Sequence, residues 1–184
     1  MLDFERGKLA EVYLIKPQLF QDERGHFKET YHRDNYREIG VEGPFVQDNV
    51  SWSKRHVLRG LHYQRCFPQG KLVQVLVGRV FDVAVDLRPE SPTYGQWEGC
   101  ELSAENHHQL YLPPGLAHGF VVLSEAAAFH YKCTDIYRPD DEAGIVWNDP
   151  ALAIAWPVSA PVLSPKDANL PRWADANCSG ESAL

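Results

Sequence analysis

The chain has 184 residues, of which 44% are hydrophobic and 23% charged, as in an ordinary globular protein of one domain spanning 1–184. It carries 18 basic against 25 acidic residues, and the net charge of −7 argues against general nucleic-acid binding. No apolar run approaches the ~20 residues of a membrane span, and the first residues lack the apolar core of a signal peptide. The four scattered cysteines contain no CxxC pair, so we expect reduced thiols, a cytoplasmic location and no cysteine zinc site.

Turn signals at short intervals separate a series of β-like runs. Many short strands at this spacing predict an all-β sandwich or barrel. Only 33–39 reads as a helix within the body. The last twenty residues read as an irregular arm over the barrel, with about seven frayed residues at its end, 178–184. The predicted strands cover 12–20, 26–32, 45–52, 57–64, 72–77, 80–87, 94–102, 109–112, 118–123 and 129–137.

Three polar side chains interrupt two of the apolar runs. Arg59, His62 and Lys71 stand within a short stretch that otherwise reads as core strand. Polar groups removed from water need partners, so this pattern indicates a lined cavity. Strand alternation places Lys71 on an inward face. Arg59 and His62 are out of phase, and a bulge at Gly60 would restore a common direction.

A base beside a cation suits proton abstraction next to a carbonyl, because the cation stabilises the enolate oxygen. A lone strand histidine is more often structural, but the neighbouring cations favour a catalytic role for His62. Such a base needs a carboxylate partner, and Asp167, Asp82 and Asp86 are all candidates. In the late run 129–137, two tyrosines share one face and could line the same cavity.

Two further features concern possible ligands. Arg24, Arg59, Lys71 and Lys166 would form an anion site suited to a diphosphate if they converge. A metal-dependent cupin is the main competitor, with His118 as a possible ligand. The metal site of such a cupin needs a second histidine two positions after the first on the same strand. Here Tyr63 and Gln64 follow His62, so that second histidine is absent. We therefore predict no bound metal.

Ten segments, in order and spacing from about residue 12 to 167, resemble the dTDP-4-dehydrorhamnose 3,5-epimerase family. Any one of them is weak evidence, but the ordered series is specific. They are 22–27 (Asp-Glu-Arg-Gly-His-Phe), 47–49 (Gln-Asp-Asn), 58–64 (Leu-Arg-Gly-Leu-His-Tyr-Gln), 70–73 (Gly-Lys-Leu-Val), 82–88, 114–120, 131–135, 147–150, 156–157 and 163–167. At residue 165 the chain has proline where the family often has an acidic residue.

The resemblance implies a cupin-type jelly-roll barrel with short peripheral helices, a homodimer, and neither metal nor other cofactor. The implied reaction is epimerisation at C3 and C5 of dTDP-4-dehydro-6-deoxy-glucose, on the way to dTDP-rhamnose. His62 matches the proton acceptor, Asp167 its partner, Tyr131 the proton donor on the opposite face, and Lys71 the group near the C4 oxygen. The positions that match ligand contacts are Arg24, Glu29, Gln47, Asp48, Asn49, Arg59, His118, Tyr137, Glu142 and Lys166.

Alternatives remain at this stage. A mono-epimerase or a ketoisomerase of a dTDP-4-keto-6-deoxysugar would use the same base and acid. A metal-dependent cupin oxygenase and a non-catalytic sugar-binding jelly roll are further options, and the second would have no need of a base and acid pair.

Overall fold

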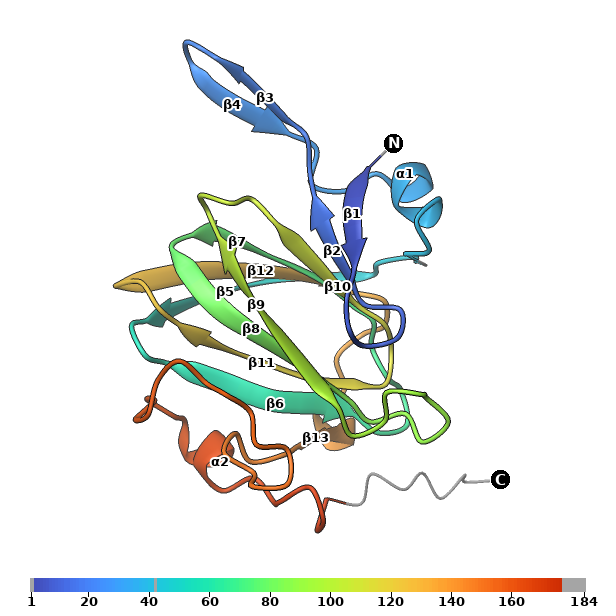
Figure 1. Cartoon of the computed structure of the whole chain (residues 1–184), viewed down its shortest axis with the longest axis vertical. Helices are drawn as coiled ribbons and strands as arrows, with labels where there is room; N and C mark the ends of the chain where they lie inside the picture. Colours follow the sequence, from blue (N-terminus) through green and yellow to red (C-terminus); the bar gives the residue numbers. More distant parts are fainter. Residues whose placement is uncertain (1, 42, 177–184) are drawn as a thin grey trace.

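Two antiparallel β-sheets stack face to face in the computed structural model, which describes residues 2–41 and 43–176 (Figure 1). The six-stranded sheet has the order β1 (Asp3–Arg6), β2 (Tyr13–Lys16), β10 (Gln109–Leu112), β7 (Lys71–Val77), β12 (Ala126–Cys133), β5 (Gln47–Lys54). The five-stranded sheet has the order β13 (Glu142–Gly144), β6 (Leu58–Gln64), β11 (Leu116–Val122), β8 (Arg79–Asp86), β9 (Trp97–Ser103). The predicted all-β jelly-roll class is confirmed, with the strands in two separate sheets rather than one closed ring.

The main core lies between the two sheets. Inward side chains of β7 and β12, such as Val75 and Phe129, meet Phe120 and Val122 of β11. The rings of Phe120 and Phe129 stack with their centroids 4.1 Å apart. Each such side chain stabilises the fold by roughly 1.5–3 kcal/mol when fully buried.

A second core lies on the outer face of the five-stranded sheet. There Leu61, Val83 and Ala117 pack against Ile145 and Leu152 of the chain that follows β13, which we call the C-terminal arm (residues 145–176). Strand β11 is consequently buried along its whole length. Burial on both faces explains why this strand reads as a continuous apolar run rather than an alternating one.

The peripheral elements lie at opposite ends of the molecule. A hairpin of β3 (Leu19–Asp22) and β4 (Gly25–Lys28) projects from the sandwich, followed by α1 (Arg33–Arg37). The 3-10 turn η1 (Pro139–Asp141) precedes β13, and the arm carries α2 (Pro165–Ala168) at the far end from the hairpin (Figure 1). No helix of the described residues is long and apolar enough to cross a membrane. The predicted fraying of 178–184 lies outside the described residues.

Several predicted boundaries were wrong. The run 12–20 is two strands, β2 and β3, and Pro17, which cannot donate to a ladder, stands between them. Tyr94 lies in a turn, and β9 begins only at Trp97, after Gly95 with a φ of +74°. The run 129–137 ends as a strand at Cys133, so strand alternation does not place Tyr137.

The predicted bulge in β6 is confirmed. His62 pairs with His118 and Arg59 with Phe120, so three steps along β6 match two along β11. Gly60 has a φ of +112°, and a Cβ there would lie 2.6 Å from the Cα of Gly119. Only glycine suits this backbone conformation and this close approach. The extra residue turns Arg59 and His62 toward the same side.

Candidate active site

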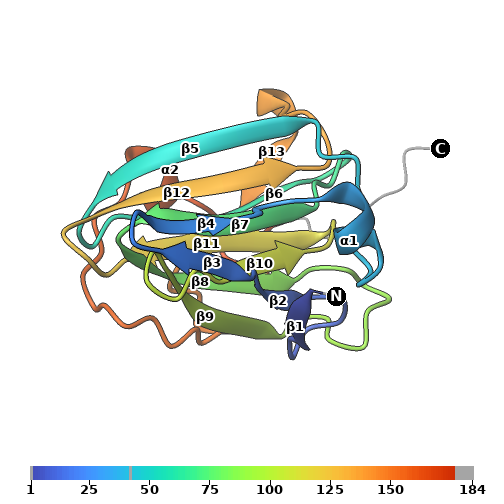
Figure 2. The same cartoon turned by 90° about the horizontal axis from the view of Figure 1, so that it is seen from above.

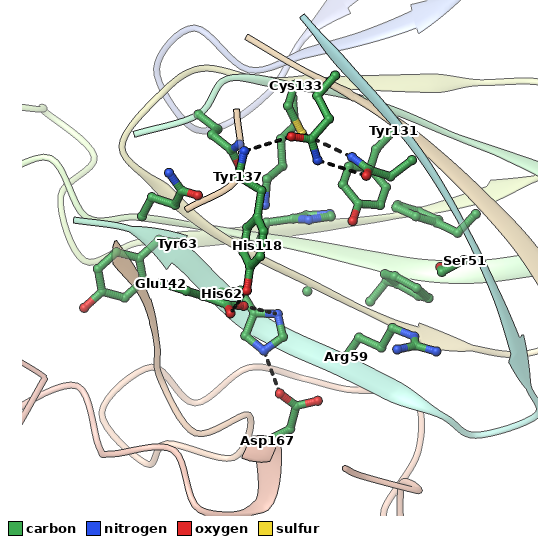
Figure 3. A pocket seen from close by; sticks show the side chains of 18 of the residues that line it. Ser51, Arg59, His62, Tyr63, His118, Tyr131, Cys133, Tyr137, Glu142 and Asp167 are labelled. Carbon is green, nitrogen blue, oxygen red and sulfur yellow. Dashed lines mark hydrogen bonds and ion pairs between the residues drawn. The ribbon is translucent and has the colours of Figure 1, made fainter. Parts of the chain in front are cut away.

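A cavity of about 410 Å³ opens between the two sheets (Figure 3). Its walls come from β5, β7 and β12 of one sheet, β6, β11 and β13 of the other, and α2 of the arm. The edge strand β5 lies beside β12 on this side of the sandwich (Figure 2). Eleven of the predicted site residues line the cavity: Gln47, Asn49, Arg59, His62, Lys71, His118, Tyr131, Tyr137, Glu142, Lys166 and Asp167.

His62 is paired with Asp167, which settles the choice among three carboxylates. Its Nε2 lies 2.6 Å from Oδ1 of Asp167. Asp82 instead contacts His118, at 2.9 Å, and Asp86 accepts from Arg88.

The environment of Asp167 keeps its carboxyl ionised. Burial raises the pKa of Asp167, but the hydrogen bonds from the side chains of His62 and Ser164, together with nearby positive charge, lower it overall. A carboxylate at Nε2 holds a proton there, so Nδ1 is the basic nitrogen. Nδ1 lies 3.8 Å from Oε1 of Glu142, which stands beside His62 on the neighbouring strand of the same sheet (Figure 3).

Tyr131 faces His62 from the other sheet. It projects from β12, whereas His62 projects from β6, so the two side chains lie on opposite walls of the cavity (Figure 3). Burial raises the pKa of the Tyr131 hydroxyl, and Cys133 and Glu142 add to the effect. A phenol with a raised pKa stays protonated at neutral pH and can donate a proton.

Lys71 supplies a cation in the same space. It is the first residue of β7, with Val73 and Val75 following it on the inward face. Burial lowers the pKa of Lys71 overall, and Cys133, Asp82 and Glu142 oppose this shift only in part. In its protonated form, such a weakly solvated lysine can stabilise negative charge that develops on a ligand oxygen.

Three polar groups form the rim near Glu142. The Tyr137 hydroxyl donates to Oε2 of Glu142 at 2.5 Å, and Lys166 forms an ion pair with the same carboxylate. The hydrogen bond to Glu142 raises the pKa of Tyr137 to about 12. The backbone N–H of Tyr137 donates to Oε1 of Gln47 at 2.8 Å, which holds this loop residue at the cavity.

Three predicted ligand-contacting residues do not line this cavity. Arg24 lies in the projecting hairpin, where it pairs with Asp22. Glu29 follows β4 and accepts from Nδ2 of Asn35 at 3.1 Å. Asp48 pairs with Lys132 at 2.7 Å, because strand alternation turns it away when Gln47 and Asn49 face inward. Gln47 and Asn49 therefore line the cavity of this chain and Asp48 does not.

Ser51 and Ser164 line the cavity and were not predicted. Ser51 lies on β5, two residues beyond Asn49, so alternation alone could have indicated it. Its Oγ is shielded from solvent and has no hydrogen-bond partner among the described residues. Ser164 is the N-cap residue just before α2, and the Ser-Pro pair at a helix start was its available signal. Within the described part of the chain, no group of three or more His, Cys, Asp or Glu side chains is placed to hold a metal ion.

Comparison with known proteins agrees with this geometry. A family model described as dTDP-4-dehydrorhamnose 3,5-epimerase matches residues 6–175. The chain is 56% identical over 166 residues to the dTDP-4-dehydrorhamnose 3,5-epimerase of Salmonella typhimurium LT2, covering 89% of this chain and 91% of the relative. It is 54% identical over 176 residues to a relative of the same name from Neisseria gonorrhoeae, covering 95% of this chain but only 54% of that longer protein.

A solved structure shares the whole fold. The dTDP-6-deoxy-D-glucose-3,5-epimerase of Legionella pneumophila, in complex with dTDP-4-keto-L-rhamnose, superposes with a TM-score of 0.89. Its sequence is 49% identical, and the match covers 94% of this chain and 99% of that one.

Proposed function

The chain belongs to the dTDP-4-dehydrorhamnose 3,5-epimerase family, and from this premise we propose that it inverts C3 and C5 of dTDP-4-dehydro-6-deoxy-glucose. The product, dTDP-4-dehydro-rhamnose, leads to dTDP-rhamnose. One observation carries the assignment. A histidine–carboxylate pair and a tyrosine with a raised pKa face each other across one cavity that also holds the side chain of Lys71.

The geometry supports a reaction on two faces of the sugar. C3 and C5 both flank the C4 ketone, so one carbonyl acidifies both hydrogens. Nδ1 of His62 takes the proton, and Asp167 stabilises the imidazolium that forms. The Lys71 ammonium stabilises the enolate oxygen. Tyr131 then delivers its phenolic proton to the opposite face of the carbon and regains one from solvent, while His62 returns its proton to solvent.

The remaining polar residues suit a nucleotide sugar. Arg59 and Lys166 offer positive charge for a diphosphate, and Gln47 and Asn49 offer amides on the same wall. His118, held by Asp82, adds a donor beside the sugar. The described residues provide every proton transfer and the charge stabilisation, so we propose that the reaction needs no metal or other cofactor.

We further propose that the protein acts as a homodimer in which the hairpin of one subunit reaches the cavity of the other. Arg24 matches a ligand-contacting position, yet its hairpin points away from the cavity of its own chain (Figure 1). Phe20 and Phe27 on that hairpin are 53% and 68% exposed, as expected of side chains that a partner covers. Glu29, at the base of the hairpin, would reach the same partner site.

A cytoplasmic location is part of the proposal. Cys66, Cys100 and Cys133 are free thiols in the structure. Thiols stay reduced in the cytoplasm, so the cysteines support this assignment.

Proton exchange tests the function directly. The ketosugar nucleotide is incubated with the protein in deuterated water and followed by NMR. We expect deuterium at both C3 and C5, inversion at both carbons, and the same rate after dialysis against a strong chelator. Exchange at one carbon only would reassign the protein as a mono-epimerase, and a migrated carbonyl as a ketoisomerase. Absence of exchange, or activity lost to the chelator and restored by metal, would contradict the proposal.

A further inference from the structure

Asp167 lies on a short strap rather than on either sheet. We define the strap as residues 163–170, between two anchors on the sandwich. At one end, Leu58 donates its backbone N–H to the carbonyl of Val162 at 3.0 Å, and Val162 donates to His56 at 2.8 Å. At the other end, Val146 donates to the carbonyl of Pro171 at 2.8 Å. The catalytic carboxylate therefore depends on how the segment between these anchors is held.

The strap contains one regular element, the four-residue helix α2. A helix this short does not form by itself, because too few hydrogen bonds offset the cost of its first turn. Side chains at its two ends hold it instead. Ser164 is the N-cap, with φ of −71° and ψ of 156°, and Nδ2 of Asn169 donates to the carbonyl of Pro165 at 2.7 Å.

The N-cap bond acts on the catalytic residue itself. Oγ of Ser164 accepts from the backbone N–H of Asp167 at 3.0 Å. Both residues line the cavity, and Asp167 is only 4% exposed. The hydroxyl thus holds the backbone from which the carboxylate reaches Nε2 of His62, 2.6 Å away.

We propose that Ser164 is a positioning residue for the reaction, holding Asp167 where it orients His62. This inference rests on the proposed function. Displacing a catalytic group by about 1 Å can cost up to roughly 10²-fold in rate, and a capping bond at that group's own N–H is where such a displacement would begin. Removing the hydroxyl should slow the chemical step and leave the ligand-binding residues of the two sheets in place.

Steady-state kinetics of three variants test the proposal. Ser164→Ala should lower kcat about tenfold and change KM by a smaller factor, because Lys166 shares the strap but Arg59, Gln47 and Asn49 lie on the two sheets. Ser164→Thr keeps a hydroxyl and should recover most of the loss. Ser159→Ala, at an exposed serine earlier on the arm, is the matched control and should behave as the parent protein. A Ser164→Ala variant with parental kcat, or a Thr variant as slow as the Ala variant, would overturn the proposal.

Two further variants separate positioning from general stability. Glycine is nearly as favourable as serine at an N-cap position but has no hydroxyl. The Ser164→Gly variant should therefore fold normally and show the same fall in kcat as the Ala variant. In an Asp167→Asn background, Ser164→Ala should cause little further loss, because the group through which it acts is already impaired. A fully active Gly variant, or a full tenfold loss repeated in the Asn background, would contradict the inference. A parent protein without epimerase activity would instead refute the proposed function.

Discussion

Lys71 shows how one residue's surroundings decide its role. An exposed lysine is strongly hydrated, and its charge interacts weakly with a ligand. Burial between the sheets lowers the pKa of Lys71, yet Cys133, Asp82 and Glu142 oppose that shift. Because burial removes water from around Lys71, its protonated form attracts a developing negative charge more strongly than an exposed lysine does.

We expect Lys71→Met to lower kcat by roughly 10²–10³-fold and to raise KM far less, because the lysine stabilises negative charge that the C4 oxygen gains only as the proton is removed, not in the bound substrate. Steady-state kinetics would measure both constants. Lys54→Met, at the exposed end of β5, is the matched control. A variant with parental kcat and only a raised KM would show that Lys71 binds the ground state.

At the scale of elements, the loop between β8 and β9 is held by a buried carboxylate. Asp86 accepts hydrogen bonds from Arg88, Ser91 and Thr93. Arg88 also contacts Glu11, which ties this loop to the turn before β2. Although burial raises the pKa of Asp86, these hydrogen bonds lower it to about 2, from an ordinary 3.8.

The sign of this shift predicts a pH dependence. A carboxylate with a lowered pKa stabilises the native state above pH 3.8, and that contribution is lost as the pH falls through about 2. We expect Asp86→Asn to lower the free energy of unfolding at pH 7 by about 3 kcal/mol, as for a broken buried ion pair. The difference from the parent should shrink between pH 4 and pH 2, as measured by urea denaturation.

The exposed pair of Arg55 and Glu125 provides the control for this measurement. Glu125→Gln removes an ion pair on the surface and should cost about 0–1 kcal/mol. A parent-to-variant difference for Asp86→Asn that stays constant down to pH 2 would contradict the account of this loop.

At the scale of the whole molecule, both subunits of the proposed dimer contribute residues to each active site. If Arg24 serves the partner's cavity, a dimer of one His62→Ala chain and one Arg24→Ala chain contains one intact site. Co-expression of the two chains should therefore restore about one quarter of the parental activity per chain at low substrate concentration, since half of the dimers are mixed. Activity no greater than that of the two separate variants would mean that Arg24 contributes to the cavity of its own chain, or to neither cavity.

The sequence predicted best those features that depend on neighbouring residues, such as strand alternation and turns. Alternation and an out-of-phase pair indicated the Gly60 bulge, and turn residues indicated the short strands of an all-β fold. The residue pattern alone could not choose the carboxylate partner of His62, which the family resemblance identified as Asp167, because Asp167 is 105 residues away and reaches His62 only through the folding of the arm. Tyr137 reaches the cavity through a loop hydrogen bond that no strand pattern describes. Arg24 matches a ligand position that the fold of a single chain does not bring to the cavity.

Deuterium exchange into the ketosugar nucleotide by the His62→Ala variant tests the central claim most directly. If His62 is the base for both carbons, no enolate forms without it, and NMR should detect no enzyme-dependent deuterium at C3 or C5. Tyr131→Phe should still allow exchange with little inversion, because His62 can return a deuteron to the face it deprotonated. Normal exchange at either carbon in His62→Ala would mean that another group removes that proton, and the mechanism built on His62 and Asp167 would be wrong.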